Sequence, residues 1–298
     1  MKTITCALAG CLLSLAACTT STPIPMDGSA TPAGCSFGEP NNTRETATPV
    51  QLNQVYAGNC VDGTGDPMDF YEFTAPATDL AGGYVQVQVR NVGGQSAEFE
   101  VWAASDNEKI QDHYTTTAGA NLDGWFTVAP GGKYRVSVHM FAGMSPQFTY
   151  DVQFKYTALN DAFEPNNSRA TAKPLTLGTA IMASAAVPAL GGLAPTDAEK
   201  DDWYSVTLAA GTATVLVSNV PSDTTCDVTA FDPSGAMVDE KYSTTDGANC
   251  KLDLTALTMA GTYTFSMQRF AGPPAREGDG ATVPAFVSGQ YTLVVTQP

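Results

Sequence analysis

The sequence predicts an all-β protein of two tandem antiparallel β-sandwiches that follow a signal peptide and a flexible tether. Three observations predict it. Short segments alternate apolar and polar residues, turn-forming residues separate them at fairly even spacing, and the two halves of the chain repeat the same motifs in the same order. Regular short strands of this kind are typical of sandwiches. No segment of ordinary helix length carries an apolar stripe at helical spacing.

The alternation is clearest in four segments. Each has valine or another apolar residue at every second position, which indicates a strand with one buried face. These segments are residues 84–89, 134–138, 213–217 and 291–295. Gly-Gly pairs and the sequences Pro-Ser-Asp and Asp-Pro-Ser-Gly interrupt the pattern, and such residues favour turns.

The internal repeat predicts two domains, residues 35–158 and 159–298. Glu-Pro-Asn-Asn-Thr-Arg at 39–44 matches Glu-Pro-Asn-Asn-Ser-Arg at 164–169. Further along, Asp-Phe-Tyr and Asp-Trp-Tyr form a second matching block, and Gly-x-Tyr and a last tyrosine-containing strand follow in both halves. A domain of this length can bury an adequate core.

The N-terminus predicts export and a lipid anchor. Residues 1–17 have one lysine followed by a short apolar run, which fits a signal peptide rather than a membrane-spanning helix. Leu-Ala-Ala-Cys at 15–18 resembles the lipobox of bacterial lipoproteins, which implies a lipidated Cys18 held at the bacterial outer membrane, on the cell surface or the periplasmic face. The alternative is an ordinary secretory cleavage site. Residues 18–34, rich in Thr, Ser, Pro and Gly, would be the flexible tether.

Composition and charge exclude several classes. The 298 residues carry a net charge of −16, and only 15% of them are charged. Such a negative chain repels phosphate backbones and anionic headgroups, so we expect no nucleic-acid partner and no polybasic membrane contact. The 43% hydrophobic content argues against disorder, and 27 Gly with 19 Pro argue against a coiled coil.

Four of the seven cysteines fall after the predicted anchor. They are Cys35, Cys60, Cys226 and Cys250. An even number in an exported chain indicates disulfides, and short loops within each half favour Cys35–Cys60 and Cys226–Cys250. A zinc site is the alternative, but the cysteines lack the close spacing that structural zinc sites use.

The Glu-Pro-Asn-Asn block, the Asp-Phe/Trp-Tyr block and the late Gly-x-Tyr strand together resemble the bacterial pre-peptidase C-terminal (PPC) domain. That family includes the collagen-binding domains of secreted clostridial collagenases, and the resemblance covers both halves. It implies a jelly-roll-like sandwich, usually an accessory module of exported hydrolases. It also implies a calcium site, which some members carry, in the Glu-Pro-Asn segment and the acids before the Tyr strand.

The residue chemistry in these blocks also suits calcium, which takes about six to eight oxygen ligands from carboxylates, amides and backbone. Magnesium suits them less because it demands stricter octahedral geometry. The first-half candidates are Glu39, Asn41, Asn42, Asp66 and Asp69. The second-half candidates are Asp161, Glu164, Asn166, Asn167, Glu199 and Asp202. The alternative is that these residues only cap turns and start strands.

Most strand aromatics are expected to fill the core or its corners, because aromatic side chains on strands mostly pack inside sheets. They are Tyr71, Phe73, Trp102, Tyr134, Trp203, Phe231, Tyr263 and Tyr291. A sugar- or peptide-binding strip is the alternative. Trp125 and Phe126 follow a Leu-Asp-Gly sequence and are expected to be less constrained and exposed.

No catalytic motif stands out. The chain lacks H-E-x-x-H, G-x-S-x-G and a phosphate-binding glycine loop, and its two histidines, His113 and His139, lie in the first half only. We therefore expect a non-enzymatic envelope lipoprotein: a binding or adhesion module, calcium-stabilised, for a protein or polysaccharide ligand. The alternatives are an envelope scaffold or assembly partner of exported proteins, and a hydrolase whose site the motifs do not reveal.

Overall fold

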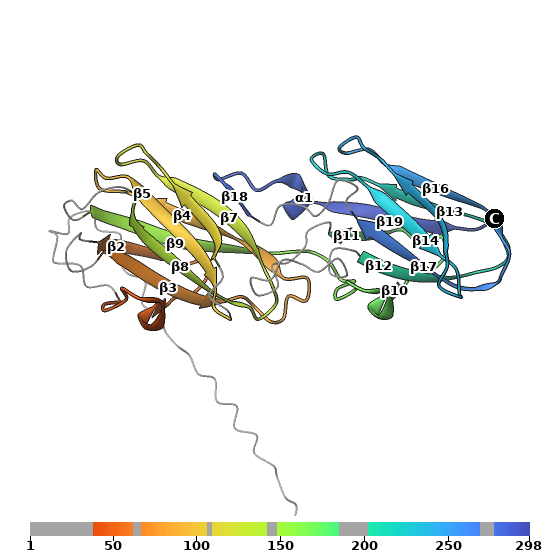
Figure 1. Ribbon diagram of the computed structural model, residues 1–298, viewed down its shortest axis with the longest axis horizontal. Helices are drawn as coiled ribbons and strands as arrows, with labels where there is room; N and C mark the ends of the chain where they lie inside the picture. The colour runs from red at the N-terminus through yellow and green to blue at the C-terminus, as the bar shows by residue number, and fades with distance from the viewer. Residues whose placement is uncertain (1–37, 62–66, 106–108, 142–147, 185–201, 269–276) are drawn as a thin grey trace, which may run out of the picture. The chain divides into compact units, whose positions relative to one another are not determined.

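The structure is a computed structural model, and it describes residues 38–61, 67–105, 109–141, 148–184, 202–268 and 277–298 (Figure 1). Nearly all the regular structure in these residues is strand, which confirms the predicted all-β fold class. The exceptions are two short 3₁₀ helices, η1 (Arg44–Thr46) and η2 (Arg169–Thr171), and the four-residue helix α1 (Ala285–Ser288). Residues 35–298 form one compact unit.

The first sandwich consists of two five-stranded sheets, β1-β3-β8-β5-β6 and β18-β7-β4-β9-β2. Its pairs are antiparallel except the parallel pair β1/β3. The strands are β1 (Thr48–Pro49), β2 (Val55–Val61), β3 (Met68–Thr74), β4 (Gly83–Arg90), β5 (Ala97–Ala103), β6 (Lys109–Tyr114), β7 (Leu122–Val128), β8 (Lys133–Met140), β9 (Phe148–Ala158) and β18 (Glu277–Asp279).

The second sandwich pairs a five-stranded sheet, β10-β12-β17-β14-β15, with a four-stranded sheet, β11-β19-β13-β16. Here β10/β12 is the parallel pair. The strands are β10 (Lys173–Pro174), β11 (Ile181–Ser184), β12 (Asp202–Leu208), β13 (Gly211–Ser218), β14 (Asp227–Phe231), β15 (Met237–Tyr242), β16 (Cys250–Leu257), β17 (Gly261–Gln268) and β19 (Gln290–Thr296).

The sequence repeat is also a repeat of strand register. Thr48 pairs with Tyr71 as Lys173 pairs with Tyr204. β3 and β12 likewise meet β8 and β17 in the same register, so corresponding positions of the two halves can be compared one by one. β9 ends at Ala158, where the sequence predicts the domain boundary. That each half folds independently stays a prediction.

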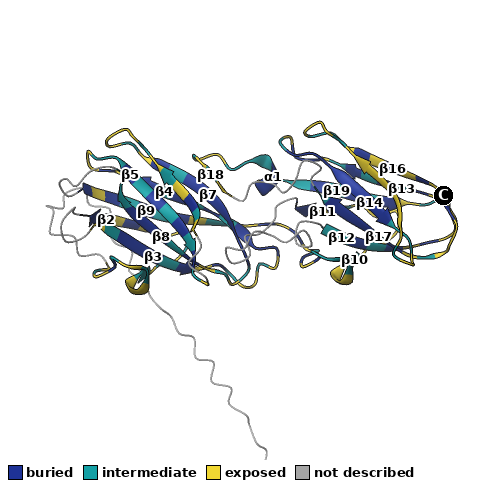
Figure 2. Cartoon of the chain, viewed as in Figure 1, coloured by how far each residue is buried: buried dark blue, intermediate teal, exposed yellow. Residues whose placement is uncertain are grey.

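Each half has its own hydrophobic core between its two sheets. The alternation predicted at 84–89 is that of β4, whose valines at 85, 87 and 89 are fully buried. Figure 2 shows the same alternation of buried and more exposed residues along several strands of both sandwiches. Burying a valine side chain contributes about 1.5–3 kcal/mol, so these repeating positions fix which face of each strand points inward.

The expected exposure of Trp125 and Phe126 is wrong. Trp125 is 2% exposed because β18 from the second half pairs with β7 and lies against it. Phe126 is fully buried because it points into the core between the two sheets. Trp125 also packs edge-on against Phe286 of α1, with ring centroids 6.3 Å apart. Gly278 of β18 lies so close that an added Cβ would be 2.8 Å from the Trp125 Nε1 atom. A strand from residues 159–298 therefore completes a sheet of the first sandwich.

The other aromatics divide between the core and the outer sheet face. Tyr71, Tyr134, Tyr263 and Tyr291 are buried, as expected, and so is Phe73. The remaining three, Trp102, Trp203 and Phe231, are partly exposed on the outer face.

An arginine from each Glu-Pro-Asn-Asn block covers one of these outer aromatics. The Arg44 guanidinium lies 3.5 Å from the Trp102 ring centroid, and Arg169 lies 4.9 Å from that of Phe231. Trp102 and Phe231 occupy corresponding positions on β5 and β14. The arginines therefore hold the two blocks against their sheets in the same way.

The Cys226–Cys250 disulfide is present, with Cα atoms 6.1 Å apart, and it links the start of β14 to β16 in the opposite sheet. Cys60 is also disulfide-bonded, while Cys35 lies outside the described residues. Within the described ranges, we find no helix with the length and hydropathy needed to cross a bilayer.

Candidate functional site

The Glu-Pro-Asn block of the first half forms a turn against β3. The Glu39–Pro40 peptide bond is cis. The Asn41 backbone N–H donates to Glu39 Oε2 over 3.2 Å, and the Asn41 carbonyl accepts from the Phe70 N–H at 2.8 Å. The turn thereby brings the side chains of Glu39 and Asn41 to the start of the strand that carries Asp69.

Three predicted ligands of the first half converge there. One terminal atom of the fully buried Asn41 amide lies 3.0 Å from Asp69 Oδ1 and 3.1 Å from Glu39 Oε1. With nitrogen in this position, the amide donates to both carboxylates. With oxygen there, three acceptor oxygens face one another, and a cation between them would offset their repulsion.

Two tyrosines hold the other oxygen of Asp69. The Tyr150 hydroxyl donates to Asp69 Oδ2, and the Tyr71 and Tyr150 hydroxyls lie 2.7 Å apart. Burial raises the pKa of both tyrosines well above the ordinary value, and the nearby Asp69 charge raises it further. Both phenols therefore stay protonated donors, which orients the Asp69 carboxylate so that Oδ1 faces Asn41.

The second half repeats this arrangement. The Tyr291 hydroxyl donates to Asp202 Oδ2 at 2.5 Å and lies 2.7 Å from the Tyr204 hydroxyl. The Glu164–Pro165 bond is cis, as in the first half. The Asn166 carbonyl accepts from the backbone N–H of the residue after Asp202 at 2.8 Å, so the same turn docks on the same strand.

Glu164 and Asn166 are buried, although they lie in a turn. Glu164 is 6% exposed, and burial, together with the nearby Asp161, raises the pKa of its carboxyl to about 7. Its Oε2 accepts the Asn166 N–H at 3.0 Å. The Asn166 amide is fully buried, and within the described residues neither of its terminal atoms makes a hydrogen bond of good geometry. A buried acid beside an unsatisfied amide has the chemistry of an oxygen-rich cation site.

Asp161 has a structural role of its own. Its Oδ1 accepts the Phe163 N–H at 2.8 Å, and its Oδ2 accepts the Ser184 N–H at 2.7 Å, which ties the start of the second half to β11. Burial raises its pKa, while these two backbone donors act in the opposite direction. Both its oxygens thus already accept backbone hydrogen bonds, one within the turn and one from β11.

The remaining predicted ligands are less informative. Asn42 and Asn167 follow the two clusters and are partly exposed. Asp66 and Glu199 lie outside the described residues. Sequence reasoning missed the positioning roles of Tyr150 and Tyr291, although the repeated tyrosine of the last strand was the available signal.

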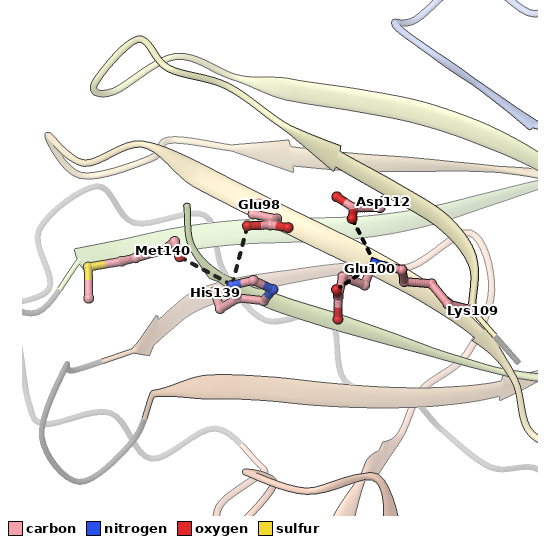
Figure 3. Close-up of polar contacts among 6 residues, drawn as sticks. All are labelled: Glu98, Glu100, Lys109, Asp112, His139 and Met140. Atoms are coloured by element: carbon pink, nitrogen blue, oxygen red, sulfur yellow. Dashed lines mark hydrogen bonds and ion pairs between the residues drawn. The ribbon is translucent and has the colours of Figure 1, made fainter. Parts of the chain in front are cut away.

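Both histidines contact acids. His113 Nδ1 lies 2.5 Å from Asp279 Oδ1. His139 Nδ1 lies 3.8 Å from Glu98 Oε2 and 3.2 Å from the Met140 carbonyl oxygen (Figure 3). In the described part of the chain, neither imidazole is hydrogen-bonded to a serine, threonine or cysteine. Among the described residues, no serine, threonine or cysteine is therefore placed to be activated as a nucleophile by either histidine.

No protein-family model matches the chain. Among solved structures, the chain is similar to the pre-peptidase C-terminal domain of a Bacillus anthracis collagenase: 23% identity over 39% of this chain and 100% of that one, TM-score 0.31. It is also similar to the CBM22-1–CBM22-2 tandem domain of Paenibacillus barcinonensis Xyn10C: 10% identity over 84% of this chain and 99% of that one, TM-score 0.23. The fold class itself rests on the strands and sheets of the chain.

Proposed function

We propose that this protein is a non-enzymatic lipoprotein of the bacterial outer membrane, a calcium-stabilised module that binds a protein or polysaccharide ligand. The observation that carries the calcium part is the convergence of Glu39, Asn41 and Asp69, repeated in the second half by Glu164, Asn166 and Asp202. Carboxylate and amide oxygens brought together by a turn and a strand suit calcium, and the tyrosine pairs would fix the aspartates before the ion binds.

Calorimetry and thermal melts of the mature chain with CaCl₂ and with chelator test this proposal. We expect heat on calcium addition and a higher melting temperature, since an ion that binds only the folded state stabilises it by about 2.7 kcal/mol at a hundredfold excess over Kd. Glu39→Gln and Glu164→Gln should each remove part of the effect. Glu240→Gln, which neutralises an exposed acid on β15, is the matched control. Absence of both heat and melting shift would reject calcium.

The proposed anchor is tested separately. Metabolically supplied palmitate should label the wild-type protein and should not label Cys18→Ala. That variant should also leave the membrane fraction. Unchanged fractionation of Cys18→Ala would contradict the lipid anchor while leaving the calcium proposal intact.

An exposed aromatic pair supports ligand binding in the first sandwich. Tyr114, 49% exposed at the end of β6, stacks on Phe141 with ring centroids 3.9 Å apart and planes 3° apart. A rigid aromatic surface of this kind suits a sugar ring or an apolar peptide side chain. On a glycan array, Tyr114→Ala should lose binding, while Tyr242→Ala, at the corresponding position of β15, should retain it. Equal binding by both variants would count against this surface.

A scaffold function is the second candidate, and β15 favours it. This strand lies at the edge of its sheet, all six residues are exposed, and Met237 is 62% exposed. An open edge with apolar residues can pair with a strand of another exported protein. Val238→Pro should then abolish partner co-purification without changing glycan binding.

A further inference from the structure

A second group of metal-ligating side chains lies on the outer face of the first sandwich, separate from the Glu-Pro-Asn turns. Glu98 and Glu100 occupy alternate positions of β5, and His139 of β8 is directly opposite Glu98. Opposite and alternate residues of a sheet share one face. One ligand atom from each of the three lies within 4.8 Å of the others, and Figure 3 shows the three side chains gathered along these neighbouring strands.

Ser137 is an independent observation that favours a bound polar group beside Glu98, Glu100 and His139. It is opposite Glu100 and two residues before His139, so it is on the same face. It is fully buried, and its Oγ has no hydrogen-bond partner among the described residues. A buried hydroxyl without a partner is costly, and a water held by a metal ion would satisfy it.

The local charge also favours a cation. The carboxyl of Glu98 is 14% exposed and lies beside the Asp112 and Glu100 carboxylates, so three acidic groups share a small, partly buried area. The nearest ammonium, Lys109 Nζ, lies 3.2 Å from Glu100 Oε1 and 2.7 Å from Asp112 Oδ2 (Figure 3). Lys109 thus neutralises the side of the cluster away from His139 and leaves Glu98 without a lysine or arginine ion pair in the described structure.

We propose that Glu98, Glu100 and His139 bind a divalent transition-metal ion of the zinc class. An imidazole with two carboxylates suits zinc and its neighbours, whereas calcium and magnesium take oxygen ligands. Ligand atoms around a tetrahedral ion with bonds of about 2.1 Å lie about 3.4 Å apart, so small side-chain rotations would close the site. Three protein ligands leave a coordination position for water near Ser137.

The second sandwich provides a built-in comparison. The shared register places Asp227, Thr229 and Gln268 where the first has Glu98, Glu100 and His139. The imidazole and one carboxylate are missing there, so we expect one such site in the two sandwiches. Because the site uses none of the proposed calcium ligands, it stands or falls independently of calcium binding.

The test is a ZnCl₂ titration by calorimetry of the untagged mature chain in saturating calcium. We expect one zinc bound at this site. His139→Gln, which installs the second-half residue, and Glu98→Gln with Glu100→Gln should each weaken binding about tenfold or more. His113→Gln is the matched control and should leave affinity unchanged. Lys109→Met removes a competing cation and should tighten binding severalfold.

A spectroscopic measurement keeps the test decisive if a ligand variant misfolds. Co²⁺ added to the wild-type and Lys109→Met proteins should give the visible absorption of a low-symmetry site with a nitrogen ligand, and zinc should displace it. Zinc affinity that survives His139→Gln and the double glutamate variant, or a cobalt spectrum like that of the aqueous ion, would overturn the proposal.

Discussion

The two sandwiches share a strand order and an acid–amide–tyrosine network, yet they bury that network to different depths. In the first, the Asn41 amide can donate to two carboxylates at once, so the cluster can satisfy itself without an ion. In the second, Glu164 is buried with a raised pKa beside an amide that lacks good hydrogen bonds. Without an ion, the motif therefore costs little folding free energy in the first sandwich and more in the second. The stability of the second copy should depend more on a bound cation.

The largest expected effect is the contribution of Glu164, in the second sandwich, to the pH dependence of stability. The carboxyl of Glu164 has a folded pKa of about 7 against an ordinary value of 4.5. The folded state therefore holds this proton more tightly, so its contribution to stability is present below pH 4.5 and is lost as pH rises to about 7, by about 2–3 kcal/mol. Chemical unfolding of the calcium-free chain across this range should show the loss.

Two variants separate the copies in that experiment. Glu164→Gln should reduce the slope, leaving the part contributed by Glu98, and should remove part of the calcium gain above pH 7. Glu39→Gln should leave the slope in place, because it changes the other cluster. If the free energy of unfolding changes with pH equally in the wild type and in both variants, the proposed difference between the sandwiches is wrong.

The next effect tests how well each aspartate is shielded from water. Tyr150→Phe removes a donor from Asp69, which is 2% exposed, and should cost about 1–3 kcal/mol. Tyr291→Phe should cost less, because Asp202 is partly exposed and water can replace the hydroxyl. Denaturant melts of both variants measure the difference. A larger loss for Tyr291→Phe would contradict the burial argument.

A third prediction concerns β18, which has no counterpart among the described strands of the second sandwich. Gly278→Ala adds a Cβ 2.8 Å from the Trp125 Nε1 and should lift β18 from β7, at a cost of about 1–2 kcal/mol. Hydrogen exchange should become faster at the Trp125 indole and at the β7 amides that face β18. Unchanged protection would mean that β18 adjusts without leaving the sheet.

The smallest effect compares the two arginines. Arg44→Ala loses a contact with an indole and should cost about 0.5–1 kcal/mol. Arg169→Ala should cost more, since Arg169 also donates to the carbonyls of Gly235 at 3.1 Å and Asp232 at 3.2 Å. Thermal melts that rank the two in the opposite order would show that the aromatic contact outweighs the hydrogen bonds.

Local pattern was sufficient to predict the strands and their duplication. The valine alternation of β4 identifies its buried face. The repeated blocks predict that β3 pairs with β8 in the same register as β12 with β17. The Glu-Pro-Asn turn is local in sequence, and its recurrence before the Asp-Phe-Tyr and Asp-Trp-Tyr blocks made part of the candidate site predictable. Its contact with β3 is long-range. Whether these residues hold calcium stays a prediction.

What the sequence could not supply depends on contacts between distant strands. Tyr150 reaches Asp69 because β9 and β3 lie in opposite sheets, and nothing in the spacing of the two residues expresses that. Trp125 looked exposed because its cover, β18, is three residues long and too short to show any alternation. The pair of Glu98 and His139 likewise requires the β5/β8 register, which only the folded sheet defines.

The late position of β18 in the chain has a consequence for biosynthesis. β7 and its sheet are made early, whereas the strand that covers their edge follows β17 of the second half. A nascent or C-terminally shortened protein therefore presents β7 with unpaired backbone groups and an uncovered Trp125, a template for pairing with another copy. The edge of β7 is therefore covered only after residues 277–279 have been made and have paired with it.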